Sequence, residues 1–244
     1  MKAVYASTVN HADPLAALAV GEQLEPQARP FWSTVSVRAV TVNHHDVWSL
    51  QGVGLAAEQT PMILGTDAVG ILDEDIPGKH GLKAGSEVVL YTFVGTDGAG
   101  VAPGERRTIL SEKYPGTMAE KTSVPSANVF AKPASLTTAE AAALGTSWLT
   151  AYSLLFDAAG IKPGDSVLIQ GAGGGVSTAA IQLAHAAGLE VFVTSRDADK
   201  RSKALKLGAN AALEIGARLP RKVDAVIESV GAATWSHSMK SVRP

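Results

Sequence analysis

The sequence predicts an α/β chain of two domains, a strand-rich domain over residues 1–132 and a domain of alternating strands and helices over residues 133–244. In the first domain, short valine-rich runs are separated by glycine and proline, which is typical of a small barrel or sandwich. In the second, apolar β-branched runs alternate with helical periodicity, which is typical of a parallel sheet with helical crossovers. A glycine-rich run, Gly171–Val176, joins the first of these strands to the next helix.

The strongest strand signal in the first domain is Val35–Val42, where apolar and polar residues alternate. Further short strands are expected between glycine and proline residues, at 63–64, 68–72, 87–91 and within 117–129. Between the last two of these, Gly95–Gly116 is rich in glycine and has no clear periodicity. We therefore expect an irregular loop there.

The second domain opens with a helix start at Thr137, where Glu140 three residues later completes a capping box. An alanine-rich helical run follows. Strands are then expected at 166–170, 190–195 and 224–228, and helices at 176–187 and 199–207. Gly188 and Gly208 follow the two helices and are expected to end them in the left-handed conformation.

The composition excludes several classes of function. The chain has 21 Lys and Arg against 23 Asp and Glu, so it lacks the basic patch that binds nucleic acid or an anionic membrane surface. It has no cysteine, which excludes disulfides, thiolate zinc sites and cysteine nucleophiles. The longest uncharged apolar stretch, residues 141–156, is shorter than the ~20 residues of a membrane span. We expect a soluble, cytoplasmic protein that acts on a small molecule.

The run Gly171–Val176 predicts a dinucleotide site because it lies between a strand and an amphipathic helix of one β-α-β unit. Glycine allows unusual backbone angles and the close approach of a pyrophosphate, and the helix N-terminus offers free amides to that anion. The alternative is a tight turn without a ligand. Ser177 stands where a third glycine is usual. The expected cofactor-binding residues of this loop are Gly171, Gly173, Gly174, Gly175, Val176 and Ser177.

About 20 residues beyond such a loop, an NAD-binding domain usually carries Asp or Glu against the ribose 2′-hydroxyl. Here the strand ends in Ser195 and Arg196, and Lys200 follows. A hydroxyl and cations accept a 2′-phosphate, so the sequence predicts NADP(H). Asp197 is the counter-argument, and ordinary solvated charges at a helix start are the alternative for Arg196 and Lys200.

The order of the two domains and three local motifs resemble the medium-chain dehydrogenase/reductase superfamily. The motifs are Val42–Gly52, Pro61–Gly70 and Gly145–Tyr152, and the second matches the family's Pro-x-x-x-Gly-x-(Asp/Glu)-x-x-Gly. The resemblance implies a GroES-like β-barrel catalytic domain over residues 1–132 and a Rossmann dinucleotide-binding domain over residues 133–244, incomplete at its C-terminus. It also places three residues beside the cofactor: Thr150, Ser229 and Gly231.

Within that family, the chain resembles the zinc-independent quinone oxidoreductase branch. The positions that match the Cys, His and Cys zinc ligands of the zinc alcohol dehydrogenases are Asn43, Thr66 and Thr146, and none of these is a competent zinc ligand. His44 and His45, treated as strand residues, point to opposite faces and are poorly placed to share a metal ion. We therefore expect no zinc.

The resemblance implies hydride transfer from NADPH to a quinone or an α,β-unsaturated carbonyl acceptor without a metal. Reduction of such an acceptor is favoured because no Lewis acid is expected to stabilise an alkoxide. The resemblance makes Asn43 a hydrogen-bond donor near the nicotinamide or the acceptor carbonyl. Trp48 stands where the branch often has tyrosine and offers an indole N–H and a flat wall. Asp46 is a candidate for positioning, with a turn or salt-bridge acid as its alternative.

Relative to that family the chain stops early, at Pro244, with about four of the six strands of the nucleotide sheet. We expect strand 225–230 to leave an open apolar edge. The family's usual dimer contact lies in the missing part, so a homodimer is not assured. The alternative function is a truncated, catalytically inactive NADP-binding remnant or a nucleotide-sensing module.

Overall fold

The computed structural model describes residues 1–78, 81–95, 97–101 and 104–244. Its contacts divide the chain into two compact units, Met1–Thr146 and Ser147–Pro244. This division lies C-terminal to the boundary expected at residue 132. The reason is helix α2 (Thr138–Ala142), whose Ala141 and Ala142 share an apolar cluster with Val69 of the first unit.

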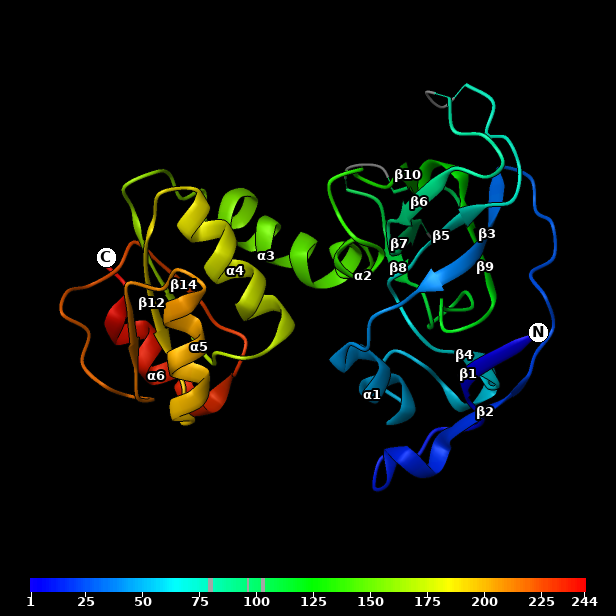
Figure 1. Cartoon of the computed structure of the whole chain (residues 1–244). Coiled ribbons are helices and arrows are strands. Elements are labelled where there is room, and N and C mark those ends of the chain that lie inside the picture. The colour runs from blue at the N-terminus through cyan, green and yellow to red at the C-terminus, as the bar shows by residue number, and fades with distance from the viewer. Residues whose placement is uncertain (79–80, 96, 102–103) are drawn as a thin grey trace. The chain divides into compact units, whose positions relative to one another are not determined.

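The first unit is built on a five-stranded antiparallel sheet with the order β10-β6-β5-β3-β9 (Figure 1). The strands are β3 (Trp32–Ala39), β5 (Val69–Leu72), β6 (Glu87–Leu90), β9 (Lys121–Pro125) and β10 (Val129–Ala131). Val35, Leu72, Val88 and Val124 form part of its fully buried core. A second sheet has the order β2 (Leu18–Glu22), β1 (Lys2–Ala6) and β4 (Met62–Ile63). Short 3-10 turns lie at Pro14–Ala17, Ala57–Gln59 and Ser126–Asn128.

Two expectations for the first unit are corrected. The segment Gly95–Gly116 is not wholly irregular, because β8 (Arg107–Ile109) pairs antiparallel with β7 (Phe93–Gly95). Residues 96, 102 and 103 of this segment lie outside the described part of the chain. His44 and His45 are not strand residues, because β3 ends at Ala39 and they open helix α1 (His44–Leu50).

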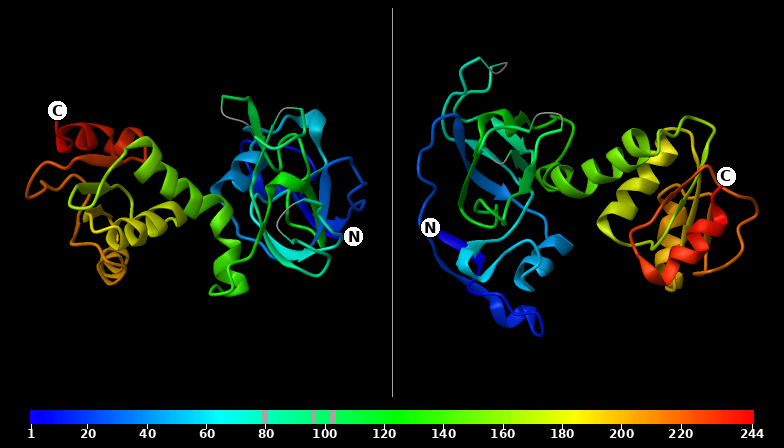
Figure 2. Two further views of the ribbon diagram at one scale, coloured as in Figure 1. Left: turned by 90° about the horizontal axis from the view of Figure 1, so that it is seen from above. Right: turned by 180° about the vertical axis from the view of Figure 1, so that it is seen from behind.

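The second unit is a four-stranded parallel sheet with the order β13-β12-β11-β14. Its strands are β11 (Ser166–Ile169), β12 (Glu190–Thr194), β13 (Ala211–Leu213) and β14 (Ala225–Ile227). This is the order 3-2-1-4 in which doubly wound dinucleotide-binding domains begin. Helices α4 (Gly175–Ala186) and α5 (Ala198–Lys206) cover one face and α6 (Ala232–Ser241) lies on the other (Figures 1 and 2).

Most elements of the second unit match the prediction. The capping box holds, since the side chain of Thr137 accepts from the Glu140 amide. Gly188 and Gly208 have φ values of 77° and 111°, which confirms the two left-handed helix ends. The alanine-rich run is not one regular helix, because α3 (Leu149–Tyr152) is flanked by π-helical turns at Leu144–Trp148 and Ser153–Ala158. None of the described helices is long and apolar enough to cross a membrane.

Strand β14 lies at one edge of the sheet, as expected. Its side chains do not form an exposed apolar strip, because Ala225 and Ile227 are buried. Just before β14, Val223 forms a parallel bridge with Val242, in which the Val223 amide donates to Ser241 O at 2.9 Å. The last residues of the chain therefore lie alongside the start of β14.

Candidate functional site

A buried carboxylate organises the polar residues of the first unit. Oδ2 of Asp67 accepts hydrogen bonds from Oγ1 of Thr41 at 2.5 Å and from Nδ2 of Asn43 at 2.8 Å, and Oδ1 accepts from Oγ1 of Thr146 at 2.5 Å. The Thr66 hydroxyl lies 3.1 Å from Nδ2 of Asn43 and 2.9 Å from Oγ1 of Thr146. These five residues are called the Asp67 cluster below. It joins Asn43, Thr66 and Thr146, the three positions that the family resemblance leads us to expect at the zinc ligands, through hydrogen bonds.

Asp67 is fully buried, and its surroundings act on its proton affinity in two directions. Burial raises the pKa of Asp67, and the hydrogen bonds from Thr146, Thr41 and Asn43 oppose that rise. Three donors converge on one carboxylate. The orientation of each donor is therefore set by Asp67.

A tight turn at Gly65 brings Thr66 and Asp67 into this position. Gly65 has φ of 94°, and a Cβ there would lie 2.6 Å from Oγ1 of Thr117 and 2.7 Å from Cγ of Met118. The Thr117 hydroxyl donates to Asp67 O at 2.7 Å. Only glycine fits this backbone without strain, so the motif Pro61–Gly70 has a physical reason for its central glycine.

The side chain of Asn43 is held within the cluster. Its amide group has two N–H donors, and three acceptors on Thr41, Thr66 and Asp67 lie within 3.2 Å of Nδ2. Asn43 is also the N-cap of α1. The structure therefore brings Asn43 together with the other cluster residues, and its role as a donor to an acceptor carbonyl stays a prediction.

Asp46 and Trp48 occupy different environments. Asp46 is buried, and its carboxylate accepts from the Asn43 amide at 2.7 Å and from the Gly65 amide at 3.0 Å. Burial raises the pKa of Asp46, and the hydrogen bonds from these two backbone N–H groups oppose the rise. Asp46 thus ties α1 to the Gly65 turn, which agrees with the alternative of a turn acid. Trp48 is 47% exposed and stands edge-on to His44, with ring centroids 5.1 Å apart.

Sequence reasoning missed a second polar pair in the first unit. Nε2 of His45 lies 3.2 Å from Oε1 of Glu112, and Nδ1 lies 3.4 Å from the Ser111 hydroxyl. Ser111 is buried and has φ of 68°, which is unusual outside glycine. His45 and Glu112 are far apart in the chain, and no local pattern marks their pairing. In the part of the chain that the structure describes, no group of three or more His, Asp or Glu residues could hold a metal ion.

The Glu112 carboxylate gives a pH prediction. Burial raises the pKa of Glu112. Hydrogen bonds from His45, Thr108 and the Ile109 backbone N–H together lower it by more, so the folded pKa lies below the ordinary value. A lowered pKa contributes stability above the unfolded pKa, about 4.3, that is lost as pH falls through the folded value. We expect Glu112→Gln to cost about 1 kcal/mol at pH 7 and less below pH 4. Urea unfolding of both proteins from pH 7 to pH 3 measures this, and a difference that grows toward acid pH would contradict it.

The second unit carries the expected glycine-rich loop between β11 and α4. Gly171 and Gly173 have φ values of 77° and 102°, a region that favours glycine. Gly175 begins α4, and a Cβ there would lie 2.6 Å from Oγ of Ser147. Ser177 is buried, and its hydroxyl bonds to the amide and the carbonyl of Gly174, both at 3.1 Å. Ser177 therefore caps the helix start, a role that a third glycine could not fill.

The charged residues after β12 divide into two kinds. The stem of Lys200 lies over the loop, since a Cβ on Gly173 would be 2.7 Å from Cδ of Lys200. Arg196 is exposed, next to the buried Ser195. Asp197 is the N-cap of α5. Hydrogen bonds from the backbone N–H groups of Lys200 and Asp199 lower the pKa of its carboxylate. The Asp197 carboxylate, which was the counter-argument to NADP(H), thus accepts hydrogen bonds from the first turn of α5. Arg201, a further cation after β12, donates to Ser195 O at 2.7 Å.

The turn after β14 lies against the same loop. A Cβ on Gly171 would be 2.8 Å from Cγ2 of Val230. Val230 lies in the sequence between Ser229 and Gly231, the two residues expected beside the cofactor. Glu228 shapes this turn by accepting from the amides of Val230 at 2.8 Å and Gly231 at 3.0 Å. Burial raises the pKa of Glu228, but these bonds and those of Ser238 and Thr234 lower it overall.

A buried network supports the loop from behind. Gln170, which directly precedes Gly171, is fully buried, accepts from the Thr194 hydroxyl and donates to Ser238 at 3.0 Å. Val176 is half-buried in α4, and Thr150 is half-buried in α3, which packs against α4. The structure therefore gathers the glycines, Ser177, Lys200 and the Ser229–Gly231 turn, and it places Thr150 on a neighbouring helix.

The comparisons with known proteins cover both units. Residues 29–134 match the family model described as "Alcohol dehydrogenase GroES-like domain", and residues 175–244 match the model described as "Zinc-binding dehydrogenase". The chain is similar to the crystal structure of an NAD-dependent alcohol dehydrogenase, with 32% identity, a TM-score of 0.86 and coverage of 99% of this chain and 74% of that one. It is also similar to a quinone oxidoreductase from Pseudomonas syringae, with 27% identity, a TM-score of 0.81 and coverage of 100% and 70%.

Among curated proteins, the crotonyl-CoA carboxylase/reductase of Cereibacter sphaeroides is 31% identical over 212 residues, which are 82% of this chain and 49% of that protein. The chain spans about half the length of this relative and of several others that it matches.

Proposed function

Because this chain belongs to the medium-chain dehydrogenase/reductase superfamily of oxidoreductases, we propose that it transfers a hydride from NADPH to a quinone or an α,β-unsaturated carbonyl without a catalytic metal. The observation that carries the metal-free proposal is the Asp67 cluster. At the three positions that match zinc ligands it has one amide and two hydroxyls, which are neutral groups and weak zinc ligands. Their donors are directed at Asp67 and at one another, so this residue set does not fit zinc.

The residues of the second unit fit a dinucleotide. The left-handed glycines 171 and 173 allow a pyrophosphate to approach the backbone, and the first turn of α4 directs amides at the same place. Lys200 adds a cation beside the loop. When bound, NADPH supplies the hydride, and this chain's residues hold and orient it.

The choice between NADPH and NADH gives a prediction at Arg196. We expect Arg196→Ala to lower the ratio of NADPH to NADH affinity about tenfold, because the 2′-phosphate of NADPH loses a charge-assisted hydrogen bond from the exposed guanidinium. Calorimetry with each nucleotide measures the ratio, and Lys206→Ala, at the last residue of α5, is the charge-matched control. An unchanged ratio would remove Arg196 from 2′-phosphate recognition.

The acceptor class follows from the chemistry that the first unit offers. A quinone or an enone delocalises the incoming charge onto oxygen, so hydrogen bonds suffice where an alcohol would need a Lewis acid. The names of two similar proteins, a quinone oxidoreductase and a crotonyl-CoA carboxylase/reductase, agree with this class.

We propose that Asn43 gives one of its two Nδ2 hydrogens to the acceptor oxygen in place of its longer contacts to Thr41 and Thr66, while its 2.8 Å hydrogen bond to Asp67 positions the side chain. We expect Asn43→Ala to lower kcat/KM for a quinone about 10–100-fold and to leave the affinity for NADPH unchanged. Steady-state kinetics with saturating NADPH measures this. Asn10→Ala, at another half-buried asparagine of the first unit, is the control. An Asn43→Ala enzyme with unchanged kcat/KM would remove Asn43 from the mechanism.

The function itself is tested by titrating NADPH and NADH into the protein, followed by a screen of quinones and enones for NADPH oxidation. NADPH binding with turnover supports the proposal. NADPH binding without turnover of any acceptor supports the alternative, a nucleotide-binding module without chemistry. Absence of binding to either nucleotide would refute both.

A further inference from the structure

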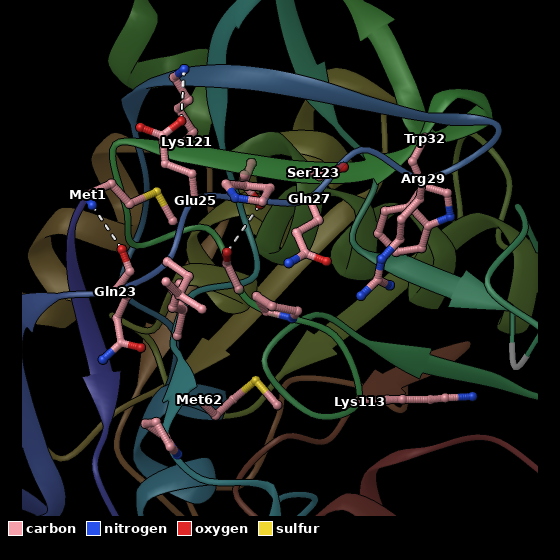
Figure 3. A pocket seen from close by; sticks show the side chains of 17 residues that line it. Met1, Gln23, Glu25, Gln27, Arg29, Trp32, Met62, Lys113, Lys121 and Ser123 are labelled. Carbon is pink, nitrogen blue, oxygen red and sulfur yellow. Dashed lines mark hydrogen bonds and ion pairs between the residues drawn. The ribbon is translucent and has the colours of Figure 1, made fainter.

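The first unit contains a cavity of about 480 Å³ that is lined by none of the residues proposed above for catalysis or cofactor binding (Figure 3). Its walls come from six parts of the unit: Met1, Trp32, residues 61–63 and 121–123, and residues within the segments 23–29 and 113–116. No member of the Asp67 cluster lines it. The volume lies within the range of about 300–1,000 Å³ that holds small organic ligands.

One end of the cavity is cationic. The guanidinium of Arg29 lies 5.0 Å from the ring centre of Trp32 and 5.6 Å from that of Tyr114. The Trp32 indole donates to Gly98 O at 2.7 Å, which anchors the first ring. Nζ of Lys113 lies 5.5 Å from the Tyr114 ring, and Figure 3 shows Arg29, Trp32 and Lys113 at the same end of the cavity.

The guanidinium of Arg29 is positioned by aromatic faces, which do not use its N–H donors as a carboxylate would. Among the described residues, none accepts a hydrogen bond or an ion pair from it in the first unit. The acidic side chain that lines the cavity, Glu25, pairs instead with Lys121 at 3.3 Å. The cavity therefore has an excess of positive charge, and the exposed Arg29 brings a planar fork of donors to its lining.

The other walls carry apolar side chains beside polar ones such as Gln23 and Gln27. Met62 and Ile63 are each 7% exposed, and Met1, Leu24 and Pro26 add further apolar lining. An apolar body and one anionic head are the ligand features that match such a site. We propose that this cavity binds an amphipathic organic carboxylate, with its carboxylate on Arg29 and its alkyl chain against Met62 and Ile63. The site is separate from the residues assigned to hydride transfer.

Octanoate is the probe for this site, and octan-1-ol is its uncharged counterpart. Calorimetry with the full chain is expected to show octanoate binding at least about tenfold tighter than octan-1-ol. Arg29→Gln is expected to weaken octanoate about tenfold and to leave octan-1-ol unchanged. Lys83→Gln, which removes a cation outside the cavity, is the charge-matched control.

Two further variants keep the proposal falsifiable if Arg29→Gln disturbs the aromatic pair. Ser123→Phe fills the cavity from β9 and is expected to abolish binding of both probes. Asn43→Ala is expected to bind octanoate as the unaltered protein does, which separates this site from the proposed acceptor site. The proposal is overturned if octanoate does not bind, if it binds no tighter than octan-1-ol, or if its affinity survives Arg29→Gln or Ser123→Phe.

Discussion

Asp67→Ala is expected to lower the free energy of unfolding by about 2–4 kcal/mol, because donors on Thr41, Asn43 and Thr146 lose their shared acceptor inside the fold. Each unsatisfied buried donor costs about 1–3 kcal/mol. The hydroxyls of Thr66 and Thr146, 2.9 Å apart, already share a hydrogen bond in the unaltered protein, so this pair does not replace the lost acceptor. The expected drop in Tm is about 5–15 °C for a chain of this size.

Asp67→Asn is the matched control. It keeps an acceptor oxygen and the side-chain volume, and a threonine hydroxyl can turn to accept from its new N–H group. We expect a loss of about 1 kcal/mol, well below that of the alanine variant. Thermal unfolding of both variants measures the difference. Equal losses would mean that the effect comes from removing the charge and not from stranding the donors.

Gly116→Ala is the second large effect, with an expected cost of about 3–5 kcal/mol. A Cβ at this position would lie 2.3 Å from Leu64 O and 2.5 Å from Gly65 O, and both atoms belong to the backbone. The Gly116 amide also donates to Ile63 O at 2.8 Å, which holds the two segments together. The chain can relieve the clash only by breaking this contact, so the turn that carries Thr66 and Asp67 would move.

Gly21→Ala serves as the comparison in the same unit. The nearest atom to a Cβ there is the Tyr5 hydroxyl at 3.5 Å, which is ordinary contact. We expect a change within about 0.5 kcal/mol. Chemical denaturation followed by tryptophan fluorescence reports both variants. A Gly116→Ala protein as stable as Gly21→Ala would show that the 63–65 and 113–116 segments separate at little cost.

The second unit was the more predictable half because its signals are local. Strand periodicity, helix caps and the glycine run all lie within a few residues of what they determine, and the structure places β11, α4, β12 and α5 accordingly. The sequence did not predict β13, because Ala211–Leu213 is only three residues long. Helix α1 was missed although Asn43 and Asp46 have the spacing of a helix cap, because the preceding valine-rich strand dominated the pattern.

The polar contacts of the first unit could not be predicted from spacing. Thr41, Asp67 and Thr146 meet only after the chain has closed the sheet and returned through β9 and β10. The same holds for His45 with Glu112 and for Arg29 with Trp32 and Tyr114. The family resemblance singled out Asn43, Thr66 and Thr146 in the sequence. Only the three-dimensional structure shows that they are linked around one carboxylate, that of Asp67.

The N-cap role of Asp197 has a consequence for how coenzyme preference can evolve. The carboxylate of Asp197 accepts from the amides of Asp199 and Lys200, at 2.8 and 3.1 Å, and so serves the folding of α5. Arg196 beside it is exposed and takes no part in that cap. With the proposed role of Arg196 in 2′-phosphate binding, helix capping and coenzyme selection would fall to adjacent but separate side chains. Mutation can vary the charge at position 196 while the start of the helix stays intact, so selection on one trait leaves the other largely untouched.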